Sequence, residues 1–157
     1  MVEGPWGHGL FHSLELRSAL ALALALEHAP MGLLMLHDHF TGRLYPSLSY
    51  GMTPGQCATI GLHRPGAGPI GIAFSECRPV AVTATTALDD DLRSLMQAVR
   101  CPRLSVVPLV IDPPRVLGLL VLLYRRRRPS PSAPVVLLYA SVLADALAHP
   151  ERRARTA

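Results

Sequence analysis

The sequence LSVVPLVIDPPRVLGLLVLLY, at residues 104–124, is the clearest indication of how this chain folds. It contains two apolar runs, Leu104–Asp112 and Val116–Tyr124, on either side of Pro113 and Pro114. Short apolar runs of this kind, separated by a few turn residues, are typical of two strands paired antiparallel. Residues 104–124 therefore predict a β-hairpin.

A second hairpin is predicted nearer the N-terminus. Leu33–Asp38 is almost entirely apolar, Phe40–Arg43 contains a Thr-Gly turn, and Leu44–Tyr50 forms the returning strand. The short apolar run Val80–Thr83 predicts a fifth strand. Because the strands of a hairpin run antiparallel, we expect one antiparallel sheet.

Helices are predicted on both sides of these strands in the sequence. The Ala- and Leu-rich segment after Ser13 is composed of strong helix formers, with Ser13 as N-cap and Pro30 as the residue that ends the helix. Pro134 is suited to the first turn of the last helix. The predicted helices are Ser13–Ala29, Pro54–Ile60, Ile70–Cys77, Asp89–Val99 and Val135–His149.

These elements predict an α+β domain with a central antiparallel sheet and with the N- and C-terminal helices packed on one of its faces. A length of 157 residues corresponds to about one domain. We divide the chain into a flexible leader at residues 1–12, the domain at residues 13–149, and a polar tail at residues 150–157.

The composition excludes several classes of protein. Hydrophobic residues make up 50% of the chain and charged residues 17%, which excludes an intrinsically disordered protein. Three cysteines do not make a disulfide framework and are typical of a reducing compartment, so we expect the protein to be cytoplasmic. No uncharged apolar run is long enough to cross a membrane, and we expect no membrane partner.

Several stretches, taken in order, resemble the GAF domain family of small sensory modules related to PAS domains. They are Gly32–Asp38 followed by Thr41–Leu44, Gly68–Ala73 followed by Arg78–Val82, Val106–Val110 followed by Val116–Leu120, and the Arg-Pro loop before the last apolar helix. The resemblance spans residues 14–148. It implies a GAF-like sheet with a ligand pocket over the face opposite the terminal helices.

The resemblance also implies an alternative function, because some GAF proteins are enzymes that reduce free methionine-(R)-sulfoxide with three cysteines. Cys57 and Cys101 lie in the matching regions of this chain, but Ile70 stands where the family has another thiol. The opposing interpretation is that Cys57, Cys77 and Cys101 are small buried apolar residues. We expect no catalytic residue and no enzymatic activity.

The sequence identifies no cofactor. The bilin-binding members of the family attach the pigment to a cysteine commonly followed by histidine, and none of the three cysteines here has that neighbour. The cyclic-nucleotide-binding members share an Asn-Lys motif, and this chain contains neither Asn nor Lys.

Two polar clusters are candidate binding sites. His37 and His39 share a face of the predicted strand, and with His63 they would supply three metal ligands. We favour the interpretation that His37 and His39 are exposed residues of the turn and that no metal is bound, because a metal site also needs an ordered outer shell. Arg125–Arg128 is the densest cluster of charged residues in the sequence, but only Tyr124 beside it offers an aromatic ring that could stack on bases. We therefore expect no specific nucleic-acid binding.

The leading hypothesis is a sensory or regulatory GAF-type domain that binds a small molecule and signals through a homodimer. The segment Ser18–Leu26 has no polar side chain after Ser18, and the last helix is interrupted only by Tyr139, Ser141 and Asp145. We therefore expect a partner copy to cover the outer faces of both helices. A dimerisation module without a ligand is the third hypothesis. The family's geometry suggests the following binding residues: Tyr50, Gln56, Cys57, Ile70, Phe74, Thr83, Thr85 and Met96. Because these residues carry little net charge, we expect a neutral or weakly polar ligand.

Overall fold

A computed structural model describes residues 14–61, 63–83, 90–126, 140–142, 144–145 and 148 of the chain. Four helices and five strands are defined in these ranges. In chain order they are α1 (Leu14–Leu26), β1 (Met31–Asp38), β2 (Arg43–Tyr50), α2 (Pro54–Thr59), α3 (Gly68–Ser75), β3 (Val80–Thr83), α4 (Asp90–Val99), β4 (Arg103–Val110) and β5 (Val116–Tyr124). The proposed leader and tail lie outside the described residues.

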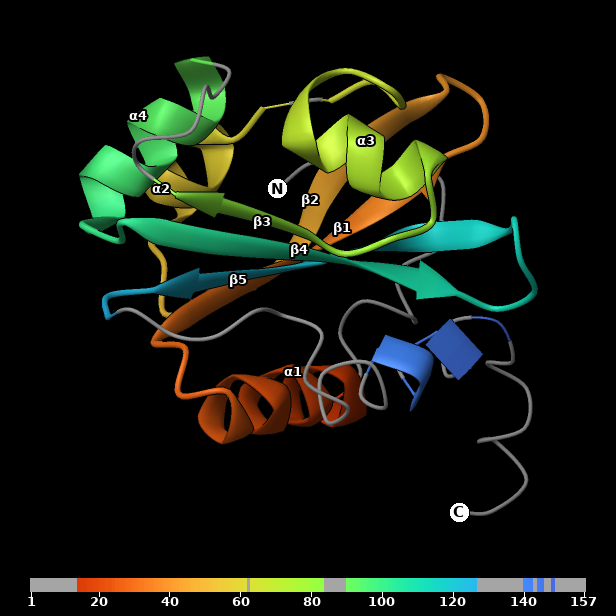
Figure 1. The fold of residues 1–157 in the computed structure, drawn as a ribbon. Coiled ribbons are helices and arrows are strands. Elements are labelled where there is room, and N and C mark those ends of the chain that lie inside the picture. The colour runs from red at the N-terminus through yellow and green to blue at the C-terminus, as the bar shows by residue number, and fades with distance from the viewer. Residues whose placement is uncertain are drawn as a thin grey trace.

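The five strands form one antiparallel sheet in the order β2-β1-β5-β4-β3. Both predicted hairpins are confirmed, and the fifth strand Val80–Thr83 joins the edge of the sheet beside β4. Helices cover the two faces of this sheet, with α1 on one side and α2, α3 and α4 on the other (Figure 1). The α+β architecture expected from the sequence is confirmed.

The side chains of each central strand alternate between two separate apolar clusters. On the α1 side, Leu34 of β1 and Leu120 of β5 pack with Leu20 and Leu24 of α1. Ala140 and Ala144 of the last helical segment belong to the same cluster, so both terminal helices pack on one face, as predicted.

On the other face, Leu33 and Val121 pack against buried side chains of α3 and α4, among them Ile70 and Leu95. Because β1 and β5 are covered on both faces, their residues are apolar at consecutive positions and do not alternate with polar ones.

The boundaries of several elements differ from the prediction. The first helix ends at Leu26, three residues before the predicted end, and His28 then takes a left-handed backbone conformation with φ of 51°. The first strand begins at Met31 instead of Leu33. The helix predicted at Ile70–Cys77 is Gly68–Ser75; Cys77, with φ of 51°, lies beyond its end because a left-handed residue cannot continue a right-handed helix.

No helix in the described ranges is long and apolar enough to cross a membrane.

Candidate functional site

Three of the predicted ligand residues come together between the sheet and the layer of α2, α3 and α4. Ile70 of α3 and Met96 of α4 are buried in the apolar cluster on this face, with exposed fractions of 0% and 5%. Phe74, one turn after Ile70, is half-buried and packs against the same cluster. These three side chains therefore form part of the apolar core between the sheet and the helices on this face.

Gln56 and Cys57 lie on α2, which packs against α4. The side chain of Gln56 closes the start of α2: its Oε1 accepts a hydrogen bond from the backbone N–H of Thr53 at 2.9 Å, and the Thr53 hydroxyl accepts one from the backbone N–H of Gln56 at 3.2 Å. This reciprocal capping holds the end of the helix. Gln56 therefore has a structural role at this position.

Thr83 and Tyr50 lie far apart in the sheet. Thr83 ends β3 and Tyr50 ends β2, and these are the two edge strands. Four strand spacings separate the edges, which corresponds to about 19 Å. A small ligand cannot contact both backbones at once. Thr85, the remaining predicted ligand residue, lies outside the described residues.

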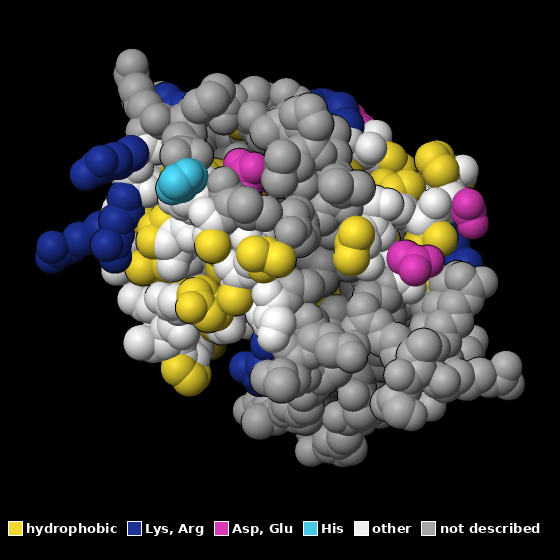
Figure 2. All heavy atoms as spheres, turned by 90° about the horizontal axis from the view of Figure 1, so that it is seen from below, with side chains coloured by type: hydrophobic (Ala, Val, Ile, Leu, Met, Phe, Trp, Pro, Cys, Tyr) yellow, Lys and Arg dark blue, Asp and Glu magenta, His cyan; other side chains and the backbone are white. Residues whose placement is uncertain are grey.

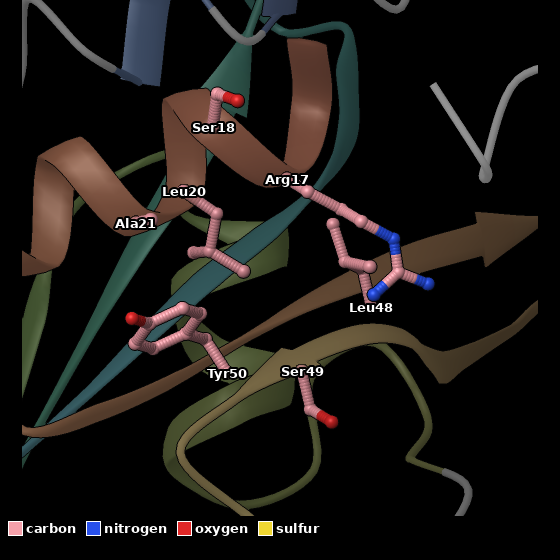
Figure 3. Close-up of a pocket in the computed structure, with 7 residues that line it drawn as sticks. All are labelled: Arg17, Ser18, Leu20, Ala21, Leu48, Ser49 and Tyr50. Atoms are coloured by element: carbon pink, nitrogen blue, oxygen red, sulfur yellow. The ribbon is translucent and has the colours of Figure 1, made fainter. Parts of the chain in front are cut away.

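Tyr50 lies on the α1 side of the sheet, away from Ile70 and Met96. There it lines a groove of about 270 Å³ between α1 and β2. Figure 3 shows the Tyr50 ring beside Leu20 of α1, with the Arg17 guanidinium near Leu48 at the other end of the groove. The lining residues are Arg17, Ser18, Leu20, Ala21, Leu48, Ser49 and Tyr50. Sequence reasoning did not identify this groove.

The Cys57 and Cys101 thiols are poor nucleophiles at neutral pH. Burial raises the pKa of Cys57, against the opposing effect of a hydrogen bond with Ser49. Burial likewise raises the pKa of Cys101, against the opposing effect of the nearby Arg125 guanidinium. Reactive thiols have a lowered pKa, because the thiolate is the attacking species. The environment of both cysteines therefore argues against redox catalysis.

Cys77 differs from the other two cysteines in its contacts. It is half-buried and lies after α3, where its Sγ lies 3.5 Å from the carbonyl oxygen of Pro114 and 3.9 Å from that of Phe74. These contacts place the thiol between α3 and the turn of the β4–β5 hairpin.

His37 and His39 are in contact at the end of β1, but the expectation of two exposed turn residues is wrong for His37, which lies within the strand and is half-buried. Their ring centroids lie 4.9 Å apart, and the His37 ring lies 4.7 Å from that of Phe74. Burial, followed by the neighbouring His39, lowers the pKa of His37. Neutral imidazole is therefore the favoured form of His37 in this contact with Phe74.

His63 has a different role from the other two histidines. Its backbone forms an isolated bridge with Leu44 of β2, and its Nε2 lies 2.6 Å from the carbonyl oxygen of Ile60. Within the described ranges, no three His, Cys, Asp or Glu side chains are grouped so as to hold a metal ion.

Solved structures similar to this chain share its whole architecture. The GAF domain/HD domain protein from Geobacter sulfurreducens aligns over 90% of this chain and 95% of its own, with a TM-score of 0.72 and 18% identity. The second GAF domain of DevS from Mycobacterium smegmatis aligns over 90% and 96%, with a TM-score of 0.61 and 21% identity.

A domain assigned to a two-component sensor histidine kinase protein from Sinorhizobium meliloti 1021 aligns over 92% of this chain and 96% of its own, with a TM-score of 0.70 and 15% identity. No protein-family model matches the sequence, and no curated protein matches it significantly. The likeness thus lies in the order and packing of the elements, and the chain has the fold of a GAF domain.

Proposed function

We propose that this chain is a non-enzymatic sensory or regulatory domain of the GAF type, which binds a small molecule and signals through a homodimer. Similar folds occur in a protein assigned as a sensor histidine kinase and in a GAF/HD domain protein. A fold alone does not define a function, so the proposal depends on the surface of this chain. We expect it to act in the cytoplasm, without a nucleic-acid or membrane partner.

The observation that supports a dimer is the exposure of a large aliphatic side chain on each of the two terminal helical segments. Leu22 of α1 is 49% exposed although Leu20 and Leu24 on the same helix are buried. Val142 is 48% exposed, two residues from the buried Ala140. Figure 2, which views the molecule from the α1 side, shows hydrophobic side chains at this surface. Large aliphatic side chains of this kind favour a partner that removes them from water.

A second copy is the occupant that we propose for this surface. Two helices of each copy, α1 and the segment at residues 140–148, would form a symmetric bundle in which the outer faces cover one another. An isologous contact of this kind brings equivalent apolar residues together around the twofold axis.

We propose the ligand site on the opposite face of the sheet, where Ile70, Phe74 and Met96 belong to one apolar cluster. Cys57 and Thr83, both half-buried, would add a thiol and a hydroxyl group to it. Gln56 and Thr85 remain among the proposed ligand-binding residues. The central strands connect this face to the dimer face, because adjacent residues of β1 and β5 pack into both clusters. A ligand that binds one arrangement of the strands more tightly would shift the arrangement of the terminal helices.

The methionine sulfoxide reductase alternative requires a reactive thiol. The raised pKa values of Cys57 and Cys101 do not favour it. The dimerisation module without a ligand requires only the apolar helical layer, and ligand binding separates it from the leading proposal.

Light scattering and sedimentation test the dimer. We expect the unmodified chain to be dimeric at micromolar concentration, and Leu22→Glu or Val142→Glu to be monomeric with an unchanged circular dichroism spectrum. Ala98→Glu, at an exposed position of α4 on the other face, is the control and should remain dimeric. A monomer for the unmodified chain at tens of micromolar would refute the dimer.

A thermal-shift screen with neutral and weakly polar metabolites tests the ligand. A specific ligand should raise the melting temperature with concentration. Phe74→Ala should remove this effect, whereas Ala98→Glu should keep it. If no metabolite shifts the melting temperature and the dimer persists, the dimerisation module is the correct function.

A further inference from the structure

The groove between α1 and β2 has an apolar interior and one charged end. Leu20 and Leu48 are 2% and 5% exposed, and Ala21 is half-buried. Arg17 is the single charged residue among the seven that line the groove. Figure 3 shows the Ser18 and Ser49 hydroxyls turned away from the space between Leu20 and Leu48. The groove thus combines a hydrophobic interior with a cationic end.

The Arg17 guanidinium is available for an anion. Its side chain is exposed, and none of the described carboxylates forms an ion pair with it. Arg17 and Ala21 are four residues apart, so they lie on the same face of α1, one turn from each other. A ligand extending along α1 from Arg17 would therefore reach Ala21.

The far end of the groove is aromatic. Tyr50 is 52% exposed and its ring lies beside Leu20 (Figure 3). An exposed aromatic ring facing apolar side chains offers a planar surface for a ligand's apolar body. The two ends therefore favour different parts of one molecule: an anionic group near Arg17 and an apolar group near Tyr50.

We propose that this groove binds a small carboxylate with an apolar body, of the class represented by benzoate and hexanoate. A carboxylate matches the planar fork of a guanidinium and can accept two hydrogen bonds from it. The groove has a volume of about 270 Å³, which leaves room for a ligand of this size. Phosphate lacks the apolar body that the groove would cover.

This site is distinct from the one proposed on the α2–α4 side, because the sheet separates them. A carboxylate in the groove would contact α1 and β2 at once and so hold the helix against the edge of the sheet. The groove also goes beyond the proposed function, since carboxylate binding does not require the dimer.

The experiment is a titration of the full chain with benzoate, followed by two-dimensional amide NMR. We expect saturable shifts of the α1 and β2 amide signals, with a Kd in the millimolar range or below. Arg17→Gln should weaken benzoate binding at least tenfold. Benzyl alcohol has the same ring without the charge, and Arg17→Gln should leave its binding unchanged.

Two further variants complete the test. Arg64→Gln, at an exposed position in the segment between α2 and α3, is the matched control and should bind benzoate like the unmodified chain. Ala21→Phe fills the groove and should abolish the binding of both probes. Hexanoate should compete with benzoate for the same signals.

The proposal is wrong if benzoate leaves the α1 and β2 signals unshifted, or if Arg17→Gln binds it with unchanged affinity. It is also wrong if these signals shift with protein concentration but not with benzoate, because the groove would then be an interface between two copies of the chain. Since Arg17 is exposed, Arg17→Gln should fold, and the test does not depend on the folding of Ala21→Phe.

Discussion

The backbone carbonyl oxygen of Met35 occupies the place where a side chain on Gly118 would lie. Gly118 belongs to β5 and pairs with Leu36 of β1, so this contact lies where the N-terminal hairpin meets the C-terminal one. A methyl group at position 118 would overlap the Met35 carbonyl group, which is backbone and cannot rotate away.

We therefore expect Gly118→Ala to destabilise the fold by about 1–3 kcal/mol, the usual cost of forcing an extra carbon into a packed interior. Urea unfolding followed by circular dichroism measures this loss. Gly55→Ala, in α2, is the control: its added methyl group meets no neighbour closer than 4.0 Å, and it should be neutral or slightly stabilising. Equal losses in both variants would contradict the steric explanation.

Tyr45→Phe should stabilise the protein. The Tyr45 side chain is 7% exposed, and its hydroxyl group has no hydrogen-bond partner among the described residues. A buried hydroxyl group without a partner has lost its hydrogen bonds to water and gained none in the protein. Its removal should therefore raise the free energy of unfolding by about 1 kcal/mol. A loss of stability in Tyr45→Phe would indicate that the hydroxyl group has a partner.

Tyr45 should also make stability depend on alkaline pH. Burial, followed by the nearby Asp38 carboxylate, raises the pKa of Tyr45 from 10.0 to about 12. The unfolded chain then releases this proton at a lower pH than the folded one, so stability is lost as the pH rises from about 10 to about 12. Ultraviolet titration of tyrosinate should show a late-titrating tyrosine in the unmodified chain that is absent in Tyr45→Phe.

Asp38 should contribute stability that is lost in acid. Its carboxylate accepts hydrogen bonds from the Thr41 hydroxyl at 2.8 Å and from the Phe40 backbone N–H at 2.9 Å. These bonds hold the pKa of Asp38 below its usual value of 3.8, the Thr41 bond having the larger effect. The contribution of Asp38 to the free energy of unfolding is therefore fully present above the unfolded-state pKa of 3.8. It disappears as the pH falls through the lower pKa of the folded state.

Urea unfolding at several pH values between 7 and 2 checks this expectation. Asp38→Asn should lose less stability on acidification than the unmodified chain, and Thr41→Val should show part of the same reduction. Identical acid dependence in all three proteins would exclude the hydrogen-bonded turn as the cause.

Thiol labelling should be slow at neutral pH for Cys57 and Cys101. Cys101 is 1% exposed and Cys57 is half-buried, and burial raises the pKa of both. We expect iodoacetamide to react with Cys101 only as the protein unfolds, and with Cys57 faster above pH 9 than at pH 7. Rapid labelling of either residue at pH 7 would support the reductase alternative.

The sequence predicted the helices and strands because local preferences and packing agree in this chain. In the first helix, Leu alternates with Ala at the period of a strand, yet both residues favour helix, and the helix is confirmed. The same alternation explains the exposed surface: Leu20 and Leu24, four apart, face the sheet, whereas Leu22 between them faces outward.

The site was harder to predict, and Tyr50 shows why. Leu44 packs on the α2–α4 side, so strict alternation along β2 would place Tyr50 on that side too. The pairing of β1 and β2 instead shifts at an irregularity opposite Leu34 and Met35, and Leu48 and Tyr50 then lie on the α1 side. A bulge of this kind changes the face of every later side chain, and the period of the sequence does not reveal it.

Gln56 shows the opposite case, in which the signal was present. Thr53 and Gln56 have the spacing of a capping box at the start of a short helix. Their residue types and spacing alone indicate that the Gln56 side chain closes α2, which is a structural reason for an amide at this position.

The strand order has a consequence for synthesis on the ribosome. The last strand in the sequence, β5, lies in the middle of the sheet between β1 and β4. Before β5 has left the ribosome, the nascent chain can form the β1–β2 hairpin and the β3–β4 pair. The strand that joins these two pairs is still missing. The sheet therefore closes late, through contacts between distant parts of the sequence, which slow folding and leave apolar strand edges open in the meantime.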